Sequence, residues 1–384
     1  MTSIPPDEAR YLAAALQASR VARRFLGWME VASERLAPER SVGLADEAAG
    51  TFAAPLHEAR AALDGSPPPA ALAPFARRLA EGFADVERAW DLFTSFPKAF
   101  PPESITRILG AVHHTARALE TFYLLRQALP PFADFWPEPE APPPRASMAA
   151  DARNPPDAEG RSDPSPGPAD PTPSAGPTGV VHVGQGGHHG GFALYVPEHY
   201  TSAHAWPIIV ALHGGSGNGR DFLWIWVREA KRRGYVLVAP SAVNDTWGEI
   251  DDQGVLQILA WIERRYRIDR RRILLTGLSD GATFALLYGL LHRDVYRAIA
   301  PLCGVLHPAH AMIGNLERAR GVPIYLVHGA LDFLFPVQLA RAARDTLTRA
   351  GAALTYRELP ELSHTYPQSE NIRIVEWFEA LPAP

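Results

Sequence analysis

Residues 272–287, RILLTGLSDGATFALL, carry the most specific structural signal in the sequence. A hydrophobic run leads into Gly277-Leu278-Ser279-Asp280-Gly281, and an apolar segment with helical spacing follows. This context is typical of a nucleophile elbow, in which a serine lies on a tight, strained turn between a strand and a helix. The short string alone is weak, and the strand before it and the helix after it make it specific. We therefore predict that Ser279 is a nucleophile at the end of a strand.

The residues around this stretch predict a mostly parallel α/β sheet, because short apolar runs alternate with amphipathic segments. Eight strands are expected, from the runs VVHV, FALYV, PIIVALH, YVLVAP, RILLTG, AIAPLCG, PIYLVHG and LTYREL. Helices are expected over residues 219–233, 252–267, 281–293, 336–350 and 371–381, with Asp251 or Asp252 as the N-cap of the second. GQGGHHGG, at 184–191, lies between two strands and is interpreted as a hairpin turn. A phosphate loop there or a metal site at His188 and His189 is the less favoured alternative.

A serine hydroxyl needs a general base, and the base needs a carboxylate that orients it. Asp332 follows the run PIYLVHG, 53 residues beyond Ser279, and His364 follows LTYREL, 32 residues further on. The order serine, aspartate, histidine is typical of enzymes built around such an elbow. We predict His364 as the base and Asp332 as the acid, and we interpret His328 as structural support.

The tetrahedral intermediate of such a reaction carries negative charge, which backbone N–H groups must stabilise. Leu212-His213-Gly214-Gly215-Ser216-Gly217-Asn218 stands at the end of PIIVALH, where its glycines allow a close backbone approach. We predict that the N–H groups of Gly215 and Asp280 form the oxyanion hole. Residues expected to contact the substrate are Gly214, Ser216, Trp247, Phe333 and Tyr366.

The first third of the chain has a different pattern. Apolar residues at spacings of three and four predict helices over residues 6–36, 39–63, 70–96 and 102–129, which should form an antiparallel bundle. Between Pro137 and Pro177, 13 of 41 residues are proline, which predicts a disordered linker. The expected division is a helical bundle over 1–136, the linker over 137–177 and a catalytic domain over 178–384, and we expect the two folded parts to be separable. His113 and His114 are interpreted as surface or interface histidines.

Composition narrows the expected partners and location. The formal net charge of −5 provides no field that favours nucleic acid. Cys303 is the single cysteine, so no intramolecular disulfide can form, and the opening residues lead into no apolar segment. We therefore expect a cytoplasmic protein without a membrane span and without a metal or organic cofactor. The helical part is a candidate surface for oligomerisation or contact with another protein.

The motifs LHGGSGN, TWGEIDDQGVLQIL, RILLTGLSDG, HGALDFLFP and the final SH resemble α/β-hydrolases of the carboxylesterase, feruloyl esterase and polyhydroxybutyrate-depolymerase-like group. The resemblance covers about residues 178–384. It implies the α/β-hydrolase fold, with Ser279 as nucleophile, His364 as base, Asp332 as acid and Gly215 as an oxyanion donor. Asp280 is a departure, because a neutral residue more commonly follows the nucleophile in these relatives.

These observations predict a serine hydrolase that cleaves small or medium acyl or aryl esters through an acyl-enzyme. Two alternatives remain open. One is a peptidase of the same fold, because the same three residues can cleave esters and amides. The other is a binding or scaffold protein whose helical bundle is the working part and whose hydrolase domain is vestigial.

Overall fold

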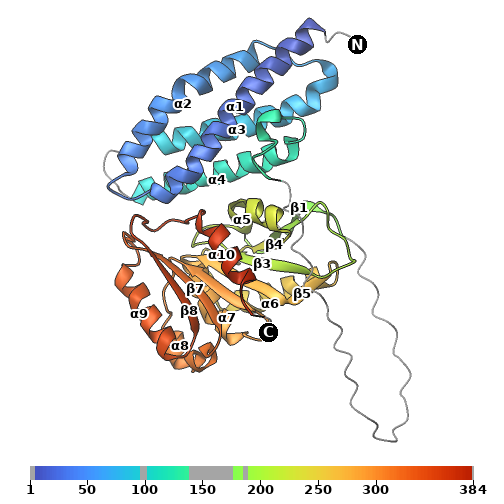
Figure 1. Ribbon diagram of the computed structural model, residues 1–384. Coiled ribbons are helices and arrows are strands. Elements are labelled where there is room, and N and C mark those ends of the chain that lie inside the picture. Colours follow the sequence, from blue (N-terminus) through green and yellow to red (C-terminus); the bar gives the residue numbers. More distant parts are fainter. Residues whose placement is uncertain (1–4, 96–101, 138–175, 185–188, 383–384) are drawn as a thin grey trace, which may run out of the picture.

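The computed structural model describes residues 5–95, 102–137, 176–184 and 189–382 (Figure 1). Almost all of the proline-rich segment expected as a linker lies outside these residues, as does His188. Within them, the chain forms a layer of long helices placed over one side of an α/β unit. The fold class expected from the sequence is therefore confirmed.

Four long helices make up the N-terminal part, as the spacing of apolar residues predicts. They are α1 (Pro6–Arg35), α2 (Ser41–Asp64), α3 (Ala73–Thr94) and α4 (Pro102–Leu125), with short 3₁₀ turns η1 (Ala70–Leu72) and η2 (Pro130–Phe132). Phe25, Leu26 and Phe83 are fully buried between them. Among the described residues, no helix combines the length and apolarity needed to cross a bilayer.

The C-terminal part is built on one eight-stranded sheet. Its strands are β1 (Gly179–Val183), β2 (Phe192–Val196), β3 (Trp206–Leu212), β4 (Val236–Pro240), β5 (Ile268–Leu278), β6 (Ala298–Leu302), β7 (Pro323–Gly329) and β8 (Ala353–Leu359). The strand order is β1-β2-β4-β3-β5-β6-β7-β8, and all pairs except β1–β2 and β2–β4 are parallel. This is the α/β-hydrolase fold, and the antiparallel pairing of β1 with β2 agrees with the expected hairpin.

Helices cover both faces of the sheet. They are α5 (Gly219–Arg233), α6 (Glu249–Glu263), α7 (Asp280–Leu291), α8 (Ala309–Met312), the 3₁₀ turn η3 (Asn315–Ala319), α9 (Val337–Arg349) and α10 (Glu370–Glu379). Successive strand residues point to opposite faces. Ile208 and Val210 of β3 therefore pack in one apolar cluster with α6 and α7, while Ile209 packs in the other with α5, α10 and the helical bundle.

The N-terminus of α6 corrects one expectation. The helix begins at Glu249, so neither Asp251 nor Asp252 is its N-cap. Asp251 instead accepts hydrogen bonds from the N–H groups of Gly248 (2.9 Å) and Val243 (2.8 Å), which ties the preceding loop to the helix. Because the pattern of apolar residues is ambiguous at helix ends, it placed the start a few residues too late.

The helical bundle packs against α5, and the apolar residues of the two parts form one cluster. Trp224 of α5 is almost completely buried, with its ring centroid 5.4 Å from that of Tyr123 and 6.3 Å from that of Trp136. Such aromatic contacts are favourable beyond the area that they bury.

Two bidentate ion pairs flank this aromatic contact. Arg220 donates to both oxygens of Glu120 (2.9 and 2.8 Å), and Arg228 donates to both oxygens of Glu30 (2.9 and 2.8 Å). Bidentate pairs of this kind fix geometry strongly. Separating the two parts would expose the shared apolar side chains and break these pairs, so the interface works against the independent folding expected from the proline-rich segment.

We predict that the intact protein unfolds in a single cooperative transition. Tryptophan fluorescence, to which the nine tryptophans of both parts contribute, and far-ultraviolet circular dichroism should give the same denaturant midpoint. Glu30→Ala should lower that common midpoint, because it leaves the partly buried guanidinium of Arg228 without its carboxylate, at a cost of about 1–3 kcal/mol. Two resolved transitions, only one of them moved by Glu30→Ala, would show that the parts fold separately.

Candidate active site

Ser279 lies on the turn between β5 and α7, with backbone angles φ 54° and ψ −114°. A positive φ is strained for a residue with a side chain, and such strain gathers at functional sites. Neighbouring glycines make the turn possible. A Cβ at Gly277 would lie 2.6 Å from the carbonyl oxygen of Gly281, and a Cβ at Gly281 would lie 2.3 Å from that of His213. The turn predicted from the sequence is thus present, with Ser279 at its tip.

Ser279, His364 and Asp332 are joined by hydrogen bonds in series. Ser279 Oγ lies 2.8 Å from His364 Nε2, and His364 Nδ1 lies 2.8 Å from Asp332 Oδ2. The other carboxylate oxygen of Asp332 accepts from the N–H groups of Leu334 (3.0 Å) and Phe335 (2.7 Å). A carboxylate on Nδ1 holds the proton on that nitrogen, so Nε2 is free to accept the proton of the serine hydroxyl.

The three residues come from the carboxyl ends of three different strands. Ser279 follows β5, Asp332 follows β7 and His364 lies in the loop after β8. The side chain of Asp332 is fully buried, and that of His364 is 9% exposed. The structure thus brings together the nucleophile, base and acid that the sequence suggested, although they are separated by up to 85 residues.

The glycine loop after β3 lies beside the serine. A Cβ at Gly214 would be 3.6 Å from Cβ of Ser279, and one at Gly215 would be 3.9 Å from Cβ of Asp280. In the part of the chain that the structure describes, the N–H groups of Gly215 and Asp280 have no hydrogen-bond acceptor. Both groups are therefore available to an oxygen atom placed next to Ser279.

His213 holds this loop in place. Its Nε2 accepts from the N–H of Ala242 (3.0 Å), so the ring proton is on Nδ1, which donates to the carbonyl of Gly214 (2.7 Å). Gly217 N–H donates to the same carbonyl (3.0 Å). Because that carbonyl and the N–H of Gly215 belong to one planar peptide unit, fixing the carbonyl also fixes the direction of the N–H. Burial lowers the pKa of His213 to about 4, so it is neutral at pH 7.

Asp280, which departs from the usual pattern of the relatives, has a structural partner. Its Oδ2 accepts from the backbone N–H of Trp247 (2.6 Å), and the indole N–H of Trp247 donates to the carbonyl of His213 (2.8 Å). Burial raises the pKa of the Asp280 carboxyl, against the hydrogen bond from Trp247, which lowers it. Asp280 and Trp247 together brace the elbow against the glycine loop, a contact that no sequence motif indicated.

The other residues expected to contact substrate lie in different surroundings. Phe333 is 43% exposed, and its ring centroid lies 6.5 Å from that of His364. Ser216 has a positive φ of 57° and donates its N–H to the carbonyl of Asp245 (2.6 Å).

Tyr366 is packed in the interior, between the sheet and α5. It is 8% exposed, donates its hydroxyl to Asn371 Oδ1 (2.7 Å) and meets the ring of Phe222 edge-on. Burial raises the pKa of its hydroxyl well above the ordinary value.

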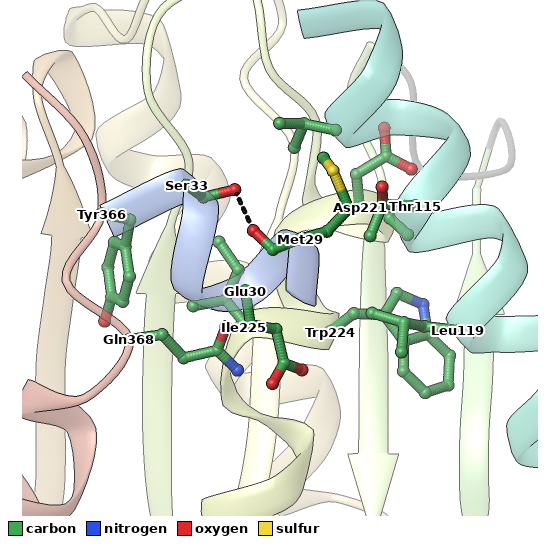
Figure 2. A pocket seen from close by; sticks show the side chains of 12 residues that line it. Met29, Glu30, Ser33, Thr115, Leu119, Asp221, Trp224, Ile225, Tyr366 and Gln368 are labelled. Carbon is green, nitrogen blue, oxygen red and sulfur yellow. Dashed lines mark hydrogen bonds between the residues drawn. The ribbon is translucent and has the colours of Figure 1, made fainter. Parts of the chain in front are cut away.

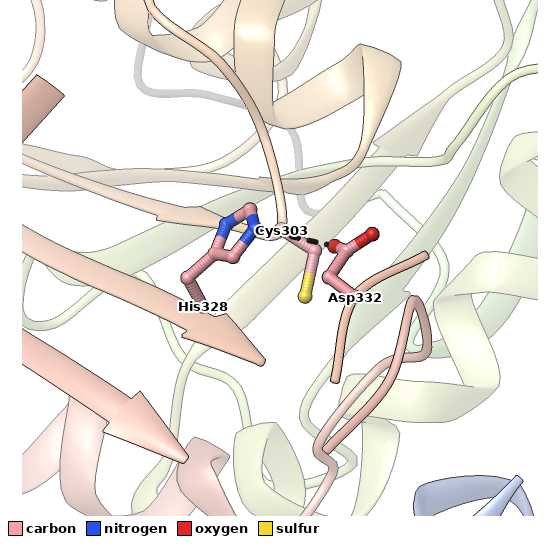
Figure 3. Close-up of side chains that lie close together, drawn as sticks. All are labelled: Cys303, His328 and Asp332. Atoms are coloured by element: carbon pink, nitrogen blue, oxygen red, sulfur yellow. Dashed lines mark ion pairs between the residues drawn. The ribbon is translucent and has the colours of Figure 1, made fainter. Parts of the chain in front are cut away.

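Cys303, His328 and Asp332 form a buried group whose side-chain atoms lie within 4.8 Å of one another (Figure 3). His328 Nε2 donates to the carbonyl of Phe335 (2.8 Å) and lies 3.3 Å from Asp332 Oδ2. Burial and the nearby Asp332 carboxylate raise the pKa of the Cys303 thiol to about 12. Asp332 Oδ2 already pairs with His364, and the Nε2 proton of His328 is directed at the carbonyl of Phe335, so hydrogen bonds account for the arrangement of this group. His328 thus supports Asp332, in line with the sequence interpretation.

Part of the chain is similar to known esterases. Residues 251–380 match the phospholipase/carboxylesterase family. A bifunctional acetylxylan esterase/xylanase of Neocallimastix patriciarum is 31% identical over 133 residues, which cover 33% of this chain and 19% of that protein. Feruloyl esterase B of Talaromyces stipitatus is 26% identical over 141 residues, covering 33% of this chain and 39% of that protein. The chain therefore spans less than half the length of these relatives.

Solved structures similar to part of this chain include a thermostable esterase and an S-formylglutathione hydrolase of Staphylococcus aureus. The first has a TM-score of 0.43 at 21% identity and covers 52% of this chain and 61% of that one. The second has a TM-score of 0.44 at 17% identity and covers 54% of this chain and 98% of that one. The match over residues 251–380, a segment that contains Ser279, Asp332 and His364, confirms the resemblance to carboxylesterases expected from the sequence.

Proposed function

We propose that this protein is a serine hydrolase that cleaves carboxylic esters through a covalent acyl-enzyme. The observation that carries the proposal is the hydrogen-bonded series from Ser279 Oγ through the His364 ring to the buried carboxylate of Asp332. The series begins on a strained turn beside two backbone N–H groups without acceptors among the described residues. A surface cluster of polar residues would require neither the strain nor the free donors.

In the first half-reaction, Ser279 Oγ attacks the ester carbonyl carbon while His364 Nε2 takes the hydroxyl proton. The carbonyl oxygen becomes an oxyanion, which accepts hydrogen bonds from the N–H groups of Gly215 and Asp280. Each such donor contributes about 3–4 kcal/mol to stabilising the transition state. His364 then gives its proton to the leaving alkoxide, the carbon–oxygen bond breaks, and the acyl group stays on Ser279.

In the second half-reaction, His364 takes a proton from water, and the resulting hydroxide attacks the acyl carbon. Collapse of the second tetrahedral intermediate breaks the bond to Ser279 Oγ, which recovers its proton from His364. Asp332 stabilises the imidazolium in both halves and holds its ring in the correct orientation.

The surroundings of the base favour a small or medium acyl or aryl ester. Leu331, Phe333 and Leu334 are exposed in the loop that carries Asp332, so an apolar group can be covered there. The relatives carry the names acetylxylan esterase and feruloyl esterase, which support an acetyl or an aromatic acyl group. We also propose substrate contacts for Gly214, Ser216 and Trp247. Tyr366 is buried, so we propose that it acts on the substrate only by holding the loop of His364, without touching the substrate itself.

The cytoplasmic location expected from the single cysteine stays a prediction. So does contact of the helical part with another protein or a second copy of the chain. Ester hydrolysis itself requires neither.

The first test addresses the nucleophile. A fluorophosphonate probe should label Ser279, and Ser279→Ala should abolish both the labelling and the hydrolysis of aryl acetates, because the attacking oxygen is gone. A panel of aryl esters and matched anilides of the same acyl groups measures the ester preference. Labelling that persists in Ser279→Ala places the nucleophile elsewhere, and faster cleavage of the anilides favours a peptidase.

The second test addresses the acid. Asp332→Asn should fold and still bind substrate, but its kcat should fall about 10⁴-fold, because an amide favours the wrong tautomer of His364 and cannot stabilise the imidazolium. Asp345→Asn serves as the matched control, because it makes the same change in a carboxylate that lies on α9 and is 52% exposed. If Asp332→Asn kept most of the activity, another carboxylate would have to act as the acid.

The third test addresses the loop that supplies the Gly215 donor. The folded state holds His213 neutral down to about pH 4, whereas an unfolded histidine takes up a proton near pH 6.5. The unfolded state therefore binds more protons between these values, and stability falls as the pH falls.

From pH 7 to pH 5, this effect should cost the wild type about 2 kcal/mol of unfolding free energy. His213→Gln should lose correspondingly less over that range, and the exposed His204→Gln should behave like the wild type. Denaturant unfolding at both pH values measures these differences. Equal losses in His213→Gln and the wild type would mean that His213 is not held neutral.

A further inference from the structure

The loop that carries His364 runs from the end of β8 to the start of α10. On the hydrolase side, the carbonyl of Leu362 accepts from the N–H of Leu331 (2.9 Å), and Tyr366 donates its hydroxyl to Asn371 (2.7 Å). The amide of Asn371 in turn donates to the carbonyl of Ile225 in α5 (2.9 Å). These contacts set the path of the loop, but all of them come from the hydrolase part.

The helical bundle holds the same loop from the other side. Glu34, near the end of α1, accepts hydrogen bonds from the N–H (2.7 Å) and the hydroxyl (2.9 Å) of Ser369. Arg40, in the turn between α1 and α2, forms an ion pair with the carboxylate of Glu361 and donates to its carbonyl (3.3 Å). The two contacts fall three residues before His364 and five residues after it, so they enclose the base.

α1 itself is firmly held on the hydrolase part. Glu30 lies one helical turn before Glu34 and therefore on the same face of α1. Its bidentate pair with Arg228 fixes that face to α5, while Phe25 and Leu26 are fully buried inside the bundle. Helix α1 and the turn that follows it thus connect α5 to both ends of the loop.

Side-chain packing between α1 and this loop is incomplete. A cavity of about 100 Å³ lies between α1, α4, α5 and the loop, and Met29, Ser33, Tyr366 and Gln368 are among the residues that line it (Figure 2). Ser33 donates to the carbonyl of Met29 in its own helix (2.7 Å). Side chains do not fill this space, whereas Glu34 and Arg40 contact the loop directly through hydrogen bonds and an ion pair.

We propose that Glu34 and Arg40 are positioning residues, which hold the loop of His364 from the helical bundle in the geometry that ester hydrolysis needs. The proposal rests on the function proposed above for His364. It makes the bundle part of the catalytic unit. A displacement of a base by about 1 Å can lower a rate by about 100-fold, so weak contacts that restrain such a loop are sufficient.

The experiment uses the full chain and a charge exchange. Arg40→Glu and Glu361→Arg should each lower kcat for a soluble aryl ester by about five- to tenfold, with KM changed less than about twofold, because the base is misplaced and the binding surface is retained. The double variant Arg40→Glu/Glu361→Arg should recover most of kcat, because the ion pair re-forms with its charges exchanged. Glu34→Ala should lower kcat by a similar factor, and Glu34→Gln should lower it less, because one acceptor oxygen remains.

Two matched controls separate positioning from general stability. Arg35→Glu and Glu47→Ala break an ion pair of similar exposure within the bundle (Arg35 Nη2 to Glu47 Oε2, 3.4 Å) and should leave kcat unchanged. Circular dichroism melting checks that every variant is folded.

Ester hydrolysis by the wild type and probe labelling of its Ser279 test the proposed function. A failure of that function is thus distinguished from a failure of the positioning inference. If the wild type is active, full kcat in the folded Arg40→Glu and Glu34→Ala variants overturns the inference. It is equally overturned by a double variant that recovers nothing.

Discussion

The close approach of two backbone segments at the end of β5 is the constraint on which the site depends. Gly281 lies so near the carbonyls of Leu212 and His213 that a side chain at that position would collide with them. This contact brings the N-terminus of α7 against the glycine loop and sets Ser279 at a positive φ. Backbone geometry therefore places the proposed nucleophile and both proposed oxyanion donors.

Two further sets of contacts adjust the site around this constraint. In the first set, hydrogen bonds of 2.6–3.0 Å join the glycine loop, the elbow and the loop after β4. They are made by His213, whose ring is neutral, and by Asp280 and Trp247. On the opposite side, α1 reaches from Arg228 to the loop of His364. The first set holds the proposed oxyanion donors, and the second holds the loop of the proposed base. In this view the N-terminal helices contribute to the geometry of the reaction.

Much of the hydrolase part could be predicted from the sequence because its signals are local. The strand, turn and helix around Ser279 are contiguous, and Asp332 and His364 each follow a recognisable strand. The position of Tyr366 shows where local signals fail. An aromatic residue two positions after the base suggested a substrate contact, but its hydroxyl is bound by Asn371 and its ring packs against α5. The sequence alone does not tell whether a side chain in a loop points toward the active site or into the protein interior.

Contacts between residues far apart in the chain were also beyond sequence reasoning. Glu30 and Arg228 are separated by 198 residues, and Arg40 and Glu361 by 321. In the sequence, each of these residues looks like an ordinary exposed charge in its own helix or loop. Proline-rich composition therefore suggested two independent parts, whereas the shared apolar cluster and these ion pairs join them. A departure such as Asp280 likewise gains its meaning only from Trp247, 33 residues away.

Detection of the acyl-enzyme shows directly whether Ser279 is the nucleophile. The protein is mixed with an aryl acetate, quenched in acid during the pre-steady-state burst, and digested for mass spectrometry. We expect the mass of one acetyl group on the peptide that contains Ser279, appearing with the burst and disappearing as substrate is consumed. Turnover without any adduct, or an acetyl group that accumulates on another residue at the rate of the burst, would contradict the account.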